Sequence, residues 1–122
     1  MPPLVTVVDD SYSVRDALPA LLRVCGYAAD CYASAEEFLQ AQTHGNTDCL
    51  LLDVELPGMS GPDLLALLKT KCVPPPVIFI SGRLDQLGLQ RLQVDGVVAC
   101  LAKPFSEEEL LEAIDRALVV GQ

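Results

Sequence analysis

The sequence has few basic side chains. Its 122 residues hold 8 Lys and Arg against 17 Asp and Glu, which gives a net charge of −9 at pH 7. Nucleic acids and anionic membranes repel such an acidic surface, so we expect this domain to bind neither nucleic acid nor a membrane directly. The excess of carboxylates is instead compatible with a site for a divalent cation.

The cysteines follow no spacing that would join or ligate them. There are five, at Cys25, Cys31, Cys49, Cys72 and Cys100, an odd number with no C-x-x-C pair. This pattern argues against a disulfide framework or a zinc site. Isolated cysteines in apolar surroundings are usually small buried hydrophobic residues. We therefore expect a reduced, cytoplasmic protein.

Targeting signals and long apolar runs are also missing. The N-terminal Met-Pro-Pro has no basic region and no long apolar stretch after it, so we expect no signal peptide. The apolar runs are too short to span a bilayer. We find no internal repeat and no linker, and a length of 122 residues with 51% hydrophobic residues suits a single domain over residues 1–122.

Strand-like and helix-like segments alternate five times. Short apolar or β-branched runs predict strands at Leu4–Val8, Ala28–Tyr32, Cys49–Asp53, Val77–Ser81 and Val97–Ala102. Apolar spacing and capping signals predict helices near residues 14–25, 34–43, 62–71, 85–94 and 106–118. Continuous apolar strands separated by helices imply an α/β fold, with a parallel sheet covered on both faces.

Two of the predicted helices carry a local conflict. Pro19 lies inside the first helix, where it should remove one backbone hydrogen bond and kink the helix near Arg15. The helix over residues 85–94 is interrupted by Gly88 and has poor apolar periodicity, so we expect it to pack loosely.

Polar residues follow four of the five strands. They are Asp9 and Asp10 after the first, Asp53 closing the third, Ser81 closing the fourth and Lys103 after the fifth. Ligands of open parallel sheets bind at the carboxyl ends of the strands, so we expect these five residues to meet there. Two carboxylates about 4–5 Å apart repel by about 3–4 kcal/mol, which protonation or a bound cation can offset. Hard oxygen ligands without a nearby His or thiolate favour Mg²⁺ or Mn²⁺.

This set of side chains suits phosphoryl transfer. A carboxylate can attack phosphorus and form an aspartyl-phosphate. Lys103 and Ser81 could then hold phosphoryl oxygens, the lysine as a point charge and the serine as a hydroxyl donor. Acidic residues after strands are often simple loop or capping residues, but a coincidence at all five positions is improbable.

Four motifs make the chain resemble the receiver domains of two-component response regulators over essentially its whole length. They are Val-Val-Asp-Asp at 7–10, Leu-Leu-Asp-Val-Glu-Leu-Pro-Gly-Met-Ser-Gly at 51–61, Ile-Ser-Gly at 80–82 and Lys-Pro-Phe at 103–105. The resemblance implies a flavodoxin-like, doubly wound five-stranded parallel sheet of order 2-1-3-4-5 with five helices. The segment Ser-Val-Arg-Asp-Ala at 13–17 is similar to a subfamily whose receivers often precede a helix-turn-helix DNA-binding domain, which we do not find in these 122 residues.

The resemblance also implies residue roles. Asp53 would accept a phosphoryl group from a histidine kinase or a small acyl phosphate, with Ser81 as the switch hydroxyl and Lys103 as the phosphate-binding lysine. Asp9, Asp10, Asp53 and the backbone carbonyl of Glu55 would hold Mg²⁺, and the Lys103–Pro104 bond would be cis. The domain would then be a switch that phosphorylates and dephosphorylates itself, and not a turnover enzyme.

One position departs from the family. Many receivers carry Tyr or Phe three residues before the site lysine, where this chain has Cys100. A cysteine cannot sweep the volume of an aromatic ring, so we expect phosphorylation to act through the loop after Ser81 and the fourth helix. The readout would be a homodimer or a docked output domain on the fourth helix and fifth strand.

Two other functions remain open at this stage. A small aspartyl-phosphate phosphatase would need a second carboxylate near the nucleophile, which Glu55 could supply, but the chain has no cap domain. A degenerate receiver would act only as an interaction module, although the complete set of site residues argues against it. No Gly-rich loop follows the first strand, so a nucleotide-binding fold is not expected. Glu55 and Arg83 could also pair at the mouth of the site and shield a phosphoryl group from water.

Overall fold

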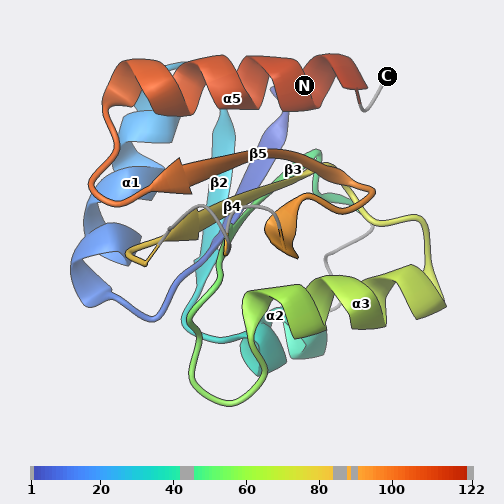
Figure 1. Cartoon of the computed structure of the whole chain (residues 1–122). Coiled ribbons are helices and arrows are strands. Elements are labelled where there is room, and N and C mark those ends of the chain that lie inside the picture. Colours follow the sequence, from blue (N-terminus) through green and yellow to red (C-terminus); the bar gives the residue numbers. More distant parts are fainter. Residues whose placement is uncertain (1, 42–45, 84–87, 89–90, 121–122) are drawn as a thin grey trace.

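The computed structural model describes residues 2–41, 46–83, 88 and 91–120. Strands and helices alternate along the chain as far as β4, and β5 is the next element that the structure describes (Figure 1). In order they are β1 (Leu4–Val8), α1 (Tyr12–Val24), β2 (Ala28–Tyr32), α2 (Ala35–Ala41), β3 (Cys49–Asp53), α3 (Gly61–Lys71), β4 (Val77–Ser81), β5 (Val97–Ala102) and α5 (Glu107–Val120).

The strands form one parallel sheet of order β2-β1-β3-β4-β5. Each strand has the bounds that the sequence predicted, and the predicted sheet order is confirmed. The order reverses at β1, so β1 and β3 lie side by side in the middle of the sheet. Their carboxyl ends carry Asp9 and Asp53 into the same place.

The described residues contain four of the five expected helices. Helix α1 begins at Tyr12 and α3 at Gly61, both slightly before the predicted positions. Half of the helix expected over residues 85–94 falls outside the described residues, and Gly88, Arg91 and Leu92 within the described half have helical backbone. Its predicted loose packing is therefore not tested.

Helices cover both faces of the sheet, α1 and α5 on one side and α2 and α3 on the other (Figure 1). Alternate residues of each central strand point to opposite faces because a strand has a period of two. In β3, Leu51 packs toward α1 and α5, whereas Leu50 and Leu52 pack toward α2 and α3. Both layers are closed, so β3 and β4 are buried along their whole length.

Helix α1 runs through Pro19 without a break. Proline has no N–H, so the carbonyl of Arg15 loses its usual helical donor. The thiol of Cys31 on β2 lies 3.8 Å from this carbonyl oxygen and donates to it. A weak hydrogen bond from the neighbouring strand thus replaces the one that the proline removes.

Two of the capping signals are Ser-x-x-Glu segments, at residues 34–37 and 106–109, and they differ in the structure. The Ser106 hydroxyl accepts from the Glu109 N–H at 3.0 Å, and the Glu109 carboxylate accepts from the Ser106 N–H at 3.2 Å. The Ser34 hydroxyl accepts from the Glu37 N–H at 3.1 Å, but it also donates to the Glu37 carboxylate. The start of α5, just after Lys103, is therefore fixed by a complete reciprocal box.

All five cysteines are free, as predicted. Their burial was predicted wrongly in part: Cys49 is buried, but Cys31 and Cys72 are exposed. Cys31 lies on the edge strand β2, where a side chain can face solvent. No helix within the described residues is long and apolar enough to cross a membrane.

Candidate functional site

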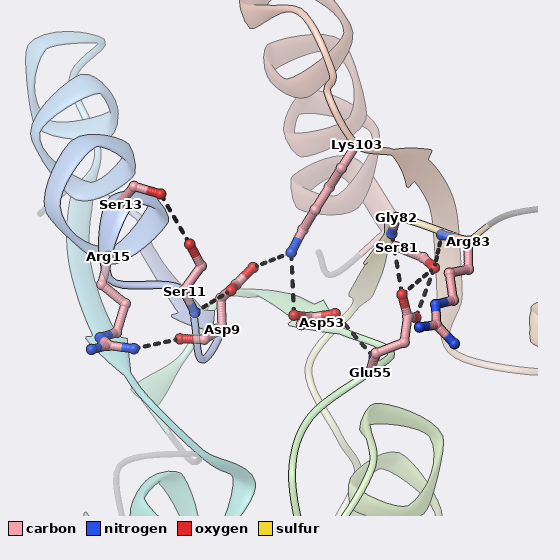
Figure 2. A network of polar contacts seen from close by, with 10 residues as sticks. All are labelled: Asp9, Ser11, Ser13, Arg15, Asp53, Glu55, Ser81, Gly82, Arg83 and Lys103. Carbon is pink, nitrogen blue, oxygen red and sulfur yellow. Dashed lines mark hydrogen bonds and ion pairs between the residues drawn. The ribbon is translucent and has the colours of Figure 1, made fainter.

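The five polar residues predicted to meet do meet at the carboxyl edge of the sheet. Asp9 follows β1, Asp53 ends β3, Ser81 ends β4 and Lys103 follows β5. Figure 2 shows the Lys103 side chain reaching between Asp9 and Asp53, with Glu55 beside Ser81. Asp10, which is exposed, has a carboxylate oxygen in the same cluster as Asp9 and Asp53.

Asp9 is fully buried and held by its neighbours on the chain. The Ser11 N–H donates to Asp9 Oδ1 at 2.8 Å, and the Arg15 guanidinium of α1 donates to the Asp9 backbone carbonyl at 3.1 Å. Arg15 was not predicted as a site residue. The only signal for it was its place in the segment at 13–17 that resembles a receiver subfamily.

Asp53 is 3% exposed, and its two oxygens have different partners. The Glu55 N–H donates to Oδ1 at 3.0 Å, and the Lys103 ammonium donates to Oδ2 at 3.2 Å. Burial and the negative charge of Asp9 raise the pKa of Asp53 to about 6, against the opposing effects of the Glu55 N–H and Lys103. The ionised form of Asp53 is thus disfavoured relative to the protonated form, and additional positive charge nearby would stabilise it.

Lys103 is the cation of the site. Its ammonium lies 2.8 Å from Asp9 Oδ2 and 3.2 Å from Asp53 Oδ2. Burial lowers the pKa of Lys103, but the two carboxylates outweigh this effect and raise it. The backbone N–H of Lys103 donates to the backbone carbonyl of Ser81 at 2.8 Å. The Lys103–Pro104 peptide bond is cis, as expected.

The acidic cluster has the composition of a cation site. One carboxylate oxygen from each of Asp9, Asp10 and Asp53 lies within 4.8 Å of the others. Asp9 Oδ2 is buried and accepts no hydrogen bond of good geometry, although it is close to the Lys103 ammonium. A buried carboxylate oxygen without a directed donor, next to two others, fits a hard divalent cation.

Glu55 binds differently from the prediction. The Ser81 hydroxyl lies 2.9 Å from Glu55 Oε1 and 2.7 Å from Oε2, and the Gly82 N–H donates to Oε1 at 3.2 Å. Among the described residues the ion pairs join Lys103 to Asp9 and Asp53, and none joins Glu55 to Arg83. The predicted Glu55–Arg83 pair was therefore wrong, because the carboxylate turns to the end of β4.

The edge thus combines a buried carboxylate, a neighbouring cation, a hydroxyl and a cluster of oxygen ligands. Asp53 can act as a nucleophile once its charge is compensated. Lys103 and a cation can neutralise charge that develops on a phosphoryl group. A parallel sheet of order 2-1-3-4-5, with Asp9 and Asp53 at the carboxyl ends of the adjacent strands β1 and β3, defines a doubly wound α/β protein of the flavodoxin-like class.

Comparison with known proteins identifies the family. Residues 5–115 match the model of the response regulator receiver domain, so the chain belongs to that family. It is 40% identical over 115 residues to the response regulator protein TodT of Pseudomonas putida, covering 94% of this chain and 51% of that protein. It is 32% identical over 113 residues to the transcriptional regulatory protein FixJ of Bradyrhizobium diazoefficiens, covering 92% of this chain and 55% of that protein.

The solved structures agree. The crystal structure of FixJ-N superposes with a TM-score of 0.85 at 32% identity, covering 98% of this chain and 95% of that one. The chain is therefore a receiver domain of the two-component response regulator type. It spans about half the length of the curated relatives that it matches.

Proposed function

We propose that residues 1–122 act as one phosphoacceptor domain and that Asp53 is the acceptor. An Asp53 oxygen attacks the phosphorus of the donor, an O–P bond forms, and the bond from phosphorus to the leaving group breaks. The leaving group is the histidine nitrogen of a kinase or the acetate of acetyl phosphate. The observation that carries the proposal is Asp53 itself, 3% exposed at an open sheet edge with Lys103 3.2 Å from Oδ2.

The same edge supports a metal requirement. Asp9, Asp10, Asp53 and the backbone carbonyl of Glu55 would hold Mg²⁺, or Mn²⁺ in its place, and the ion would supply positive charge beside the phosphoryl oxygens. Asp10 is the exposed member of the carboxylate cluster, whereas Asp9 and Asp53 are buried. Asp10→Asn should therefore leave the metal-free fold intact and weaken Mg²⁺ binding by about tenfold or more, since it removes one unit charge next to the ion. Unchanged Mg²⁺ affinity by calorimetry would remove Asp10 from the ligand set.

The partners follow from the class of protein. We propose a histidine kinase as the phosphoryl donor, and a cytoplasmic location as for response regulators in general. TodT and FixJ are named as regulatory proteins and are about twice as long as this chain. An output domain of the same polypeptide or a second copy of the chain would then respond to phosphorylation through the helix expected over residues 85–94 and β5.

Intact-mass analysis after incubation with acetyl phosphate and Mg²⁺ tests the proposal. One phosphoryl group should be added per chain, and EDTA should prevent the addition. Asp53→Asn should abolish it, whereas Asp30→Asn, which removes an exposed carboxylate on β2, should not. Equal labelling of Asp53→Asn would contradict the assignment of the acceptor.

The same experiment separates the two other functions. A switch consumes about one acetyl phosphate per phosphorylation and decays slowly, whereas a phosphatase releases phosphate continuously in excess of protein. Sustained fast turnover would favour the phosphatase. A domain that takes no phosphoryl group from acetyl phosphate or a kinase would be an interaction module.

A further inference from the structure

The Glu55 carboxylate accepts hydrogen bonds from two donors at the end of β4, the Ser81 hydroxyl and the Gly82 N–H. Both of its oxygens lie within 2.9 Å of the Ser81 hydroxyl, and Oε1 also accepts from the Gly82 N–H at 3.2 Å. The Arg83 N–H donates to Ser81 Oγ at 3.0 Å, so this oxygen already accepts a hydrogen bond on another side. The Ser81 hydroxyl therefore donates to the Glu55 carboxylate, which lies beside it in Figure 2.

A serine hydroxyl has a single proton to donate. While it is shared between the oxygens of Glu55, it is not available to an oxygen of a phosphoryl group on Asp53. Glu55 is well placed for this competition because its own N–H donates to Asp53 Oδ1 at 3.0 Å. The backbone of one residue thus contacts the acceptor carboxylate while its side chain covers the hydroxyl.

Phosphorylation of Asp53 would place a second anion, the phosphoryl group, near the Glu55 carboxylate and Ser81. A carboxylate and a phosphoryl group both seek charge-assisted hydrogen bonds from the same donors. A phosphoryl group carries more negative charge than the carboxylate and is also compensated by Lys103, which Glu55 does not contact in the described structure. Repulsion between the anions therefore favours displacement of Glu55 from Ser81.

We propose that the Glu55 side chain is an internal competitor of the phosphoryl group for the Ser81 hydroxyl and the Gly82 N–H. It holds the segment from Ser81 to Arg83 in the resting arrangement, and its displacement releases that segment. This inference rests on the proposed function, in which Asp53 carries the phosphoryl group. In this proposal Glu55 is a positioning residue, because the phosphoryl group must displace its side chain before the segment from Ser81 to Arg83 can move.

The affinity for beryllium fluoride, a phosphoryl mimic that binds Asp53 with Mg²⁺, measures this competition. Glu55→Ala should tighten binding of the mimic by about tenfold, the factor expected when a competing charge-assisted hydrogen bond is removed. Loss of a negative charge alone would also tighten binding. A double-mutant cycle with Ser81→Ala separates the two effects, since the charge effect does not need the hydroxyl.

The competition predicts that Glu55→Ala tightens binding several-fold less in the Ser81→Ala background than in the wild-type background. Equal factors in both backgrounds would overturn it. Glu112→Ala, which removes an exposed carboxylate on α5, should leave the affinity unchanged. A dependence on Ser81 is a result that a purely structural role of Glu55 would not produce.

Hydrogen exchange of the unphosphorylated, metal-free domain provides an independent readout. Glu55→Ala should accelerate exchange of the Gly82 amide, which loses its acceptor, whereas Glu112→Ala should not. Unchanged Gly82 exchange would refute the contact on which the proposal depends. If exchange accelerates but no variant binds the mimic, the assignment of Asp53 fails, and the competition fails with it although the contact is real.

Discussion

Lys103 and Asp9, 94 residues apart in the sequence, form the shortest ion pair of the site, with 2.8 Å between Nζ and Oδ2. Asp9 is fully buried and Lys103 is partly exposed. The same ammonium contacts Asp53 at 3.2 Å. One cation therefore compensates two buried carboxylates in the metal-free domain.

Removal of this cation should destabilise the metal-free domain. Lys103→Met leaves Asp9 and Asp53 without their shared partner, and urea unfolding in EDTA should show a loss of about 1–3 kcal/mol. Saturating Mg²⁺ should reduce the loss, because a second cation takes over the compensation. Lys71→Met removes an exposed charge on α3 and should change stability by less than about 0.5 kcal/mol. Equal losses with and without Mg²⁺ would show that Lys103 acts through packing alone.

Ionisation of Asp53 should oppose folding. Its pKa is raised from 3.8 to about 6 in the folded domain, so between these pH values the folded state binds more protons than the unfolded state. The contribution of the protonated Asp53 carboxyl to the free energy of unfolding is fully present below about pH 4. It is lost as the pH rises through about 6. Asp53→Asn cannot ionise, so its stability relative to wild type should increase across this window by about 1–3 kcal/mol.

Urea unfolding in EDTA at several pH values between about 4 and 7 measures this difference. Asp30→Asn makes the same substitution at an exposed position on β2 and is the matched control. A difference between Asp53→Asn and wild type that does not change with pH would mean that the Asp53 carboxyl has an ordinary pKa in the folded domain.

Gly61 should not tolerate a side chain. A Cβ at this position would collide with the backbone carbonyl of Asp53, and the Gly61 N–H donates to the Val54 carbonyl at 3.2 Å. Gly61→Ala should therefore destabilise the domain by about 1–3 kcal/mol and slow phosphorylation, because the backbone of Asp53 must shift. Thermal unfolding and the rate of labelling by acetyl phosphate measure both effects.

Gly82→Ala is the matched control, since nothing lies within 4 Å of a Cβ at that position. It should be nearly neutral for stability, and it keeps the backbone N–H that Glu55 accepts. If the two alanine variants were equally stable, the close approach of α3 to Asp53 would not matter for the fold.

Short-range patterns were sufficient for the strands and for most of the site. A short continuous apolar run such as Cys49–Asp53 favours a strand that is buried on both faces of a sheet, and all five strands have the predicted bounds. In a parallel sheet the carboxyl ends share one edge, so the positions of Asp9, Asp53, Ser81 and Lys103 followed from the strand assignments. Periodicity was less informative for the helix over residues 85–94, where Gly88 interrupts a weak pattern.

The sequence by itself determined the alternation of strands and helices, the family and the five polar residues at the sheet edge. Only the tertiary structure decided which of these residues contact each other. Glu55 and Ser81 are 26 residues apart, and their hydrogen bond depends on β3 and β4 being neighbours and on the direction of one flexible side chain. The contact between Cys31 and Arg15 depends in the same way on how α1 lies against β2. The spacing of apolar residues along the sequence determines backbone conformation. The partners of a long side chain depend on the charges and hydrogen-bond donors that the folded chain places near it.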